Sequence, residues 1–81
     1  MPARIRATRK RAVGSKQTVK AIEEGAAVVV YVARDAAGWV IEPIIESCTA
    51  EGIELVYIDS MRELGEACGI DVGAASAAVL K

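Results

Sequence analysis

The chain of 81 residues contains no histidine and no phenylalanine, and its aromatic residues are Tyr31, Trp39 and Tyr57. Without histidine it has no side chain whose ordinary pKa suits proton transfer near neutral pH. So few rings disfavour the single-strand binders that rely on stacking platforms. Carboxylates are plentiful, but they recur at helical surface spacing, which indicates a solvated face rather than an acid/base pair. These absences predict a chain that is not an enzyme and needs no cofactor.

Cysteine and long apolar runs are also scarce. Cys48 and Cys68 have no activating base and no close cysteine partner in the sequence, so we expect buried free thiols rather than a disulfide or a metal site. No run reaches the roughly 18 apolar residues that span a bilayer, and residues 1–13 lack the apolar middle of a signal peptide. We therefore expect a reduced, soluble, cytoplasmic monomer with no metal and no membrane partner.

Positive charge is concentrated at the start of the chain. Seven of the ten basic residues precede position 21, and the first acidic residue is Glu23. Residues 1–20 therefore carry +7, whereas residues 21–81, with three basic and eleven acidic side chains, carry −8, giving the −1 of the whole chain. A basic end on an acidic body is a common footprint of nucleic-acid contact.

Apolar runs and helix breakers predict three helices that alternate with three strands. The helices are expected over residues 15–24, 39–51 and 60–69, each followed or ended by a glycine. The strands are expected over residues 27–33, 55–58 and 77–80. The first strand is a continuous β-branched run without alternation, which is typical of a strand covered on both faces. This order predicts an α/β fold, a single-domain three-layer α/β/α sandwich over residues 1–81.

Local signals refine the helix starts. Ser15 is expected to cap the first helix, and Ser60 with Glu63 has the spacing of a capping box at the start of the third. Pro43 is awkward in the second helix, which is expected either to begin its regular part after residue 40 or to be kinked. Residues 3–13 could form a short helix or an arm, and both alternatives stay open.

The start of the first helix, Gly14 to Lys20, is the first candidate for an RNA contact. Free amides at a helix N-terminus favour phosphate, and Lys16 and Lys20 stand four residues apart on one solvent face. Gln17 can both donate to and accept from a base edge. The alternative is an ordinary capped helix with solvated lysines. A nucleotide-binding phosphate loop is disfavoured, because its upstream glycine and preceding strand are missing.

The small-residue loop after the third helix, residues 70–76, is the second candidate. It places Ile70 and Val72 among glycine and alanine, where apolar side chains have little local core to enter. They either pack inward beside the last strand or cover an unstacked, flipped-out base of an RNA bulge. In a three-layer fold this loop could adjoin the start of the first helix.

Three segments carry a family resemblance: Gly14 to Ile22, Ala33 to Ala36 and Met61 to Gly73. Together they resemble the kink-turn-binding ribosomal protein family, that of the archaeal large-subunit ribosomal protein seven-Ae, and in particular its short bacterial YbxF-like branch. The resemblance covers about residues 13–80. It implies an α/β/α sandwich that binds kink-turns, which are sharply bent RNA duplexes with a bulge beside sheared G·A pairs.

The resemblance also implies two sets of RNA-binding residues. The set that meets the sheared pairs and the adjoining backbone comprises Gly14, Ser15, Lys16, Gln17 and Lys20. The set that covers the bulged nucleotides comprises Ile70, Asp71, Val72 and Gly73. Archaeal members usually have Asn-Glu in place of Lys16-Gln17, an acidic residue in place of Ala37 and Lys in place of Met61. Lys-Gln is typical of the bacterial branch, so fewer contacts are expected to steady the lysines.

The sequence therefore predicts a non-catalytic RNA-binding protein that recognises kink-turn or similar bent internal-loop RNA, in ribosomal or riboswitch RNA, with the ribosome as one candidate partner. The alternative is a protein-interaction module on the same fold without specific RNA binding. The basic residues between Arg4 and Arg11 lie outside the shared motifs. They have no fixed arrangement that the sequence reveals, and we expect them to add affinity without specificity.

Overall fold

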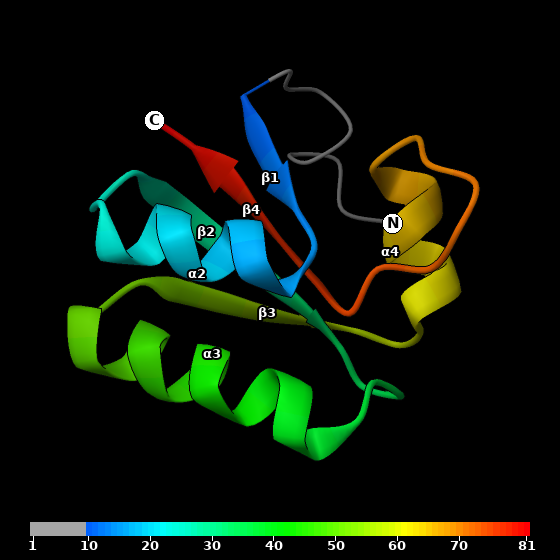
Figure 1. The fold of residues 1–81 in the computed structure, drawn as a ribbon, viewed down its shortest axis with the longest axis horizontal. Helices are drawn as coiled ribbons and strands as arrows, with labels where there is room; N and C mark the ends of the chain where they lie inside the picture. Colours follow the sequence, from blue (N-terminus) through cyan, green and yellow to red (C-terminus); the bar gives the residue numbers. More distant parts are fainter. Residues whose placement is uncertain (1–9) are drawn as a thin grey trace.

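The computed structural model describes residues 10–81, which contain four strands and three helices (Figure 1). The strands are β1 (Arg11–Val13), β2 (Ala27–Ala33), β3 (Glu54–Ile58) and β4 (Ser76–Leu80). The helices are α2 (Ser15–Glu23), α3 (Gly38–Glu51) and α4 (Met61–Ala67). Most of the basic stretch predicted at the start of the chain falls on residues 1–9, outside the described residues.

The strands form one mixed sheet in the order β1-β4-β2-β3. β2 pairs in parallel with β3, as a crossover through α3 requires, and antiparallel with β4. β1 pairs antiparallel with the other side of β4, with Ala12 opposite Ala78. Residues 11–13 are therefore neither a short helix nor an arm, the two alternatives left open by the sequence. They form the edge strand of this sheet. The Leu80 N–H also donates to the Lys10 carbonyl over 2.8 Å.

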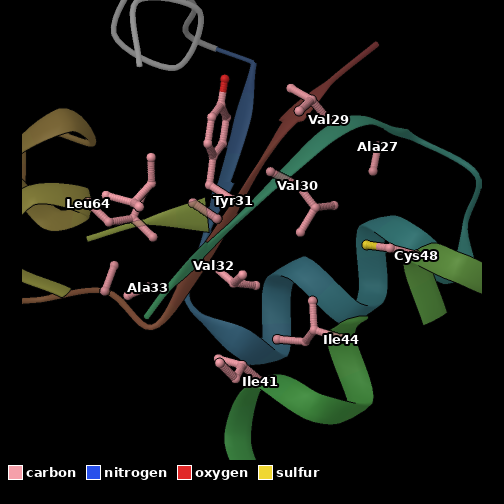
Figure 2. Packing of buried hydrophobic residues seen from close by; sticks show 14 of the residues in the cluster. Ala27, Val29, Val30, Tyr31, Val32, Ala33, Ile41, Ile44, Cys48 and Leu64 are labelled. Atoms are coloured by element: carbon pink, nitrogen blue, oxygen red, sulfur yellow. The ribbon is translucent and has the colours of Figure 1, made fainter. Parts of the chain in front are cut away.

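Helices cover both faces of the sheet, which confirms the predicted α/β/α sandwich. α2 and α3 lie on one face and α4 lies on the other (Figures 1 and 2). Val30 and Val32 of the central strand β2 point toward Ile44 of α3, whereas Tyr31 points to the side of Leu64 on α4 (Figure 2). All five side chains are buried. Full burial of each aliphatic side chain contributes about 1.5–3 kcal/mol, so this strand organises the core.

The helix ends follow the sequence signals more closely than the helix starts do. Glycine follows each helix with a positive φ of 66° to 74°, a conformation that glycine adopts without steric cost. The Ser60 hydroxyl accepts a hydrogen bond from the Glu63 N–H over 3.1 Å, as its capping spacing predicts.

The expectation of a late start for α3 was wrong. The helix begins at Gly38 and includes Pro43, which has no N–H for the carbonyl of Trp39.

Cys48 and Cys68 are buried free thiols, as predicted. Burial raises the pKa of both, although the nearby Arg11 guanidinium partly opposes this rise at Cys68. A raised pKa keeps a thiol protonated near neutral pH, so both side chains act as small core residues. Within residues 10–81, no helix has the length and hydropathy to cross a membrane.

Candidate nucleic-acid interface

Both candidate segments lie at the same end of the sheet (Figure 1). β1 and β2 end there, and β4 begins there. The Gly14 N–H at the start of α2 donates to the Ser76 carbonyl over 2.9 Å, and the Ala33 N–H donates to the Ala75 carbonyl over 2.9 Å. The start of α2 therefore adjoins the α4–β4 loop (residues 69–75), although the two are about 60 residues apart in the sequence.

Helix α2 begins without a side-chain cap. Gly14 precedes the helix with φ 93°, a backbone conformation that glycine adopts readily because it has no side chain. Its carbonyl accepts both the Thr18 N–H at 3.0 Å and the Thr18 hydroxyl at 2.8 Å. Ser15 was predicted to be the N-cap, and this prediction was wrong. Ser15 is the first residue of the helix, and no side chain within residues 10–81 caps this end.

The Ser15 hydroxyl belongs instead to a cluster of three hydroxyls. The Ser15 Oγ lies 3.3 Å from the Ser76 Oγ, which also lies 3.4 Å from the Thr18 Oγ1. Ser76 and Thr18 are completely buried. The three hydroxyls therefore anchor α2 to β4. The amides of residues 15–17 precede the first helical hydrogen bond, which the Thr18 N–H makes to the Gly14 carbonyl, so the helix itself offers them no acceptor.

The first two turns of α2 add mobile charge and a base-reading group. The side chains of Lys16, Gln17 and Lys20 are all exposed. Lys16 and Lys20 lie one helical turn apart, while the helix dipole gives the same end a partial positive charge. This arrangement suits a phosphate group flanked by a hydrogen-bonding base edge.

The α4–β4 loop is held against α4 by backbone contacts. The Ile70 N–H donates to the Gly65 carbonyl over 3.1 Å, and the Ala74 N–H donates to the Met61 carbonyl over 3.0 Å. A Cβ added at Gly65 would collide with the Val72 carbonyl oxygen. The loop can follow this path because Gly65 has no side chain.

This path separates the two apolar residues of the loop. Val72 is 70% exposed, whereas Ile70 is half-buried and packs against the core. Asp71 and Gly73 are exposed on either side of Val72. The sequence left open whether these residues pack inward or cover a base, and Ile70 packs largely inward. Val72 instead points into solvent, where it can meet a ligand.

Arg11 has a structural partner, so its assignment to a stretch without fixed arrangement was wrong. Its Nη2 donates to the Cys68 carbonyl over 2.6 Å and ties β1 to the end of α4. The Cys68 carbonyl immediately precedes the α4–β4 loop. Arg4, Arg6 and Arg9 fall outside the described residues.

The β2–α3 loop (residues 34–37) supports the same end of the sheet. Asp35 Oδ1 accepts the Met61 N–H over 2.8 Å and thereby fixes the start of α4. The Arg34 guanidinium lies 5.1 Å from the centroid of the Tyr57 ring and forms an exposed ion pair with Asp59 at 3.5 Å. Exposed pairs of this kind contribute little to stability, about 0–1 kcal/mol.

Sequence reasoning missed three residues that position this end of the molecule, namely Asp35, Gly65 and Ser76. An isolated glycine inside a helical pattern often has a packing reason, so Gly65 carried a usable signal. Ser76 carried none, because its hydroxyl partners are 58 and 61 residues away in the sequence.

Comparison with known proteins bears out the family resemblance. Residues 3–81 match the model of the Ribosomal protein L7Ae/L30e/S12e/Gadd45 family. RNA-binding protein TTE2299 of Caldanaerobacter subterraneus subsp. tengcongensis is 55% identical over 69 residues, which are 85% of this chain and 84% of that protein. RNA-binding protein YbxF of Geobacillus stearothermophilus is 42% identical over 69 residues, with the same coverage of 85% and 84%.

A solved structure shows the same fold. The Giardia lamblia 15.5kD RNA binding protein aligns with a TM-score of 0.87 at 26% identity, over 95% of this chain and 65% of that one. These three proteins are named for RNA binding and not for an enzymatic activity, which agrees with the prediction of a non-catalytic chain. On the family match and the identity to its bacterial relatives, the chain belongs to the Ribosomal protein L7Ae/L30e/S12e/Gadd45 family.

Proposed function

We propose that this chain is a non-catalytic RNA-binding protein that recognises a kink-turn or a similarly bent internal loop, in ribosomal or riboswitch RNA. Family membership and the names of its relatives support RNA binding. The observation that carries the choice of a bent RNA is the contact between the uncapped start of α2 and the loop that exposes Val72. A bent internal loop presents backbone phosphates, unusual base edges and an unpaired base close together, and this end of the molecule offers a partner for each.

The start of α2 binds the backbone and reads the paired bases. Its free amides and the ammonium groups of Lys16 and Lys20 hold phosphates, because the helix dipole and the two charges favour an anion here. Gln17 lies between the two lysines in the sequence and is exposed. Its amide both donates and accepts, so it reads the edges of sheared G·A pairs.

The α4–β4 loop covers the bulge. Val72 presents its apolar side chain to a flipped base, while Asp71 and Gly73 line the same exposed turn. Ile70, two residues before Val72, is half-buried and packs against the core. Apolar cover of this kind replaces the stacking that the base loses when it leaves the duplex.

The test compares two RNAs that differ in their power to bend. One is a kink-turn, and the other has the same length with its G·A pairs replaced by Watson–Crick pairs. The proposal predicts that the protein binds the kink-turn at least tenfold more tightly, with an affinity that falls as salt rises. Equal affinity for both would contradict recognition of the bend, and no affinity for either would favour a protein-interaction module on this fold.

A further inference from the structure

Trp39 is the aromatic residue whose ring is most open to solvent. It is 81% exposed in the first turn of α3, whereas Tyr31 is buried and Tyr57 lies beneath the Arg34 guanidinium. An indole has a large apolar face, so a ligand that covered the exposed ring would gain the free energy of burying it. A single exposed apolar residue needs no explanation by itself. The groove beside Trp39, however, suggests that this exposed ring binds a ligand.

Trp39 belongs to an open groove between α2 and α3. The groove has a volume of about 400 Å³ and is lined by residues of both helices, namely Ser15, Lys16, Val19, Trp39, Val40 and Pro43. The lining is almost entirely apolar. Its volume lies in the range of sites for small planar ligands.

We propose that this groove takes one unpaired nucleobase of the bound RNA, stacked on the indole of Trp39. The proposal rests on the proposed function, because the groove shares Ser15 and Lys16 with the start of α2. A strand whose phosphate is held there brings its own base beside Trp39. Stacking on an aromatic ring suits any base, because every base has a π-face.

Charge favours a nucleotide over an apolar protein segment or a second copy of this chain. Lys16 is the charged residue among those that line the groove, and its exposed side chain can bring its ammonium to the phosphate of the same nucleotide. An apolar segment would leave that ammonium without a partner, and a second copy would bring a second Lys16 of like charge. A nucleotide satisfies the apolar wall and the cation together.

The stacked base is distinct from the base that Val72 covers. The groove lies between α2 and α3 on one face of the sheet, whereas the α4–β4 loop comes from α4 on the opposite face (Figure 1). The RNA would thus be held on both sides of the start of α2. This extends the site beyond the bend to an unpaired nucleotide beside it.

The test uses the single tryptophan of the chain as its own reporter. A kink-turn RNA with an additional unpaired nucleotide beside the bend is titrated into the wild-type protein while tryptophan emission and its quenching by iodide are followed. Affinities of Trp39→Ala and Trp39→Phe are then measured on the same RNA. Val28→Ala serves as the matched control, because Val28 is exposed near the other end of β2.

The inference predicts that RNA changes the emission of Trp39 and protects it from iodide. Trp39→Ala should bind on the order of tenfold more weakly, while Trp39→Phe keeps most of the affinity and Val28→Ala keeps all of it. If the wild type prefers the kink-turn but its emission and the affinity of Trp39→Ala are unchanged, the inference is wrong and the proposed function stands. If the wild type shows no such preference, the proposed function fails and the inference with it. An emission change that follows protein concentration without RNA would make the groove a contact between copies, and would also overturn the inference.

Discussion

The start of α2 and the α4–β4 loop lie side by side, yet the chain builds them in opposite ways. The start of α2 takes its donors and charges from consecutive residues, Gly14 to Lys20, on the exposed side of one helix. The loop takes its shape from distant contacts, since Gly65 admits the Val72 backbone and Arg11 holds the Cys68 carbonyl. The first region supplies chemical groups, whereas the second supplies a surface.

This difference predicts different responses to mutation. Substitutions on the exposed side of α2 should change RNA binding and leave folding intact, because these side chains make no core contact. Substitutions beneath the loop should change folding and binding together, because the position of Val72 depends on the packing of α4. Ser76 connects the regions through its backbone carbonyl and its hydroxyl.

The largest effect is expected from Gly65→Ala, which tests the packing beneath the loop. The new Cβ would collide with backbone atoms of residues 72 and 73, which cannot rotate away as a side chain can. We expect a loss of about 1–3 kcal/mol in the free energy of unfolding, measured by urea denaturation, and weaker kink-turn binding. Gly38→Ala is the matched control in another helix, because its new Cβ would meet a flexible side-chain atom of Glu42 at 3.7 Å. Equal stability of the two variants would refute the close approach.

Val72→Asp should separate surface from packing. A carboxylate at this exposed position would face phosphates and flipped bases, so kink-turn affinity should fall roughly tenfold or more. The melting temperature should hardly change, because an exposed loop substitution costs about 0.5 kcal/mol or less. Val28→Asp, at the far end of β2, controls for added charge. A large drop in melting temperature for Val72→Asp would mean that Val72 is part of the core.

The sequence predicted the alternation of helices and strands because the breakers and apolar runs are local. Gly25, Gly52 and Gly69 end the helices where they should, and Ser60 caps α4. The sequence did not predict β1, whose three residues form a strand only by pairing with β4. Such a short segment has too little pattern of its own to predict a strand.

In the candidate site, too, the sequence predicted local features and missed those that depend on distant contacts. The exposed lysines and Gln17 could be predicted from their spacing in one helix. The role of the Ser15 hydroxyl could not, because its partner Ser76 belongs to β4. The exposure of Trp39 was equally hidden, since a tryptophan in an apolar helix is ordinarily a core residue.

Within α2, Gln17→Ala and Lys20→Ala should fail differently. Loss of Gln17 should cost about 1–3 kcal/mol on the kink-turn and little on plain duplex, because it removes a base contact. Loss of Lys20 should weaken both RNAs and reduce the salt slope by roughly 1, because it removes a phosphate contact. Binding titrations over a range of salt distinguish these outcomes. Parallel losses for both variants on both RNAs would overturn the division of roles.

The smallest effect is expected from deleting residues 2–9, which contain Arg4, Arg6 and Arg9. Binding to kinked and plain RNA should weaken alike and mostly at low salt, because diffuse charge is screened within about 10 Å at 0.1 M salt. The deletion must stop before Lys10 and Arg11, whose backbone and side chain bond to β4 and to Cys68. Loss of the preference for kinked RNA would place this stretch within the specific site.

The most direct test of the account is the shape of the RNA when it is bound. A kink-turn labelled with a fluorophore at the end of each stem reports the distance between the stems by energy transfer, and the same RNA with Watson–Crick pairs in place of G·A gives the extended reference. If the protein recognises the bend, energy transfer is high for the kink-turn saturated with protein and stays at the reference value for the control RNA. A saturated kink-turn that keeps the energy transfer of the extended reference would show that the protein binds RNA without recognising its bend, and would contradict the account.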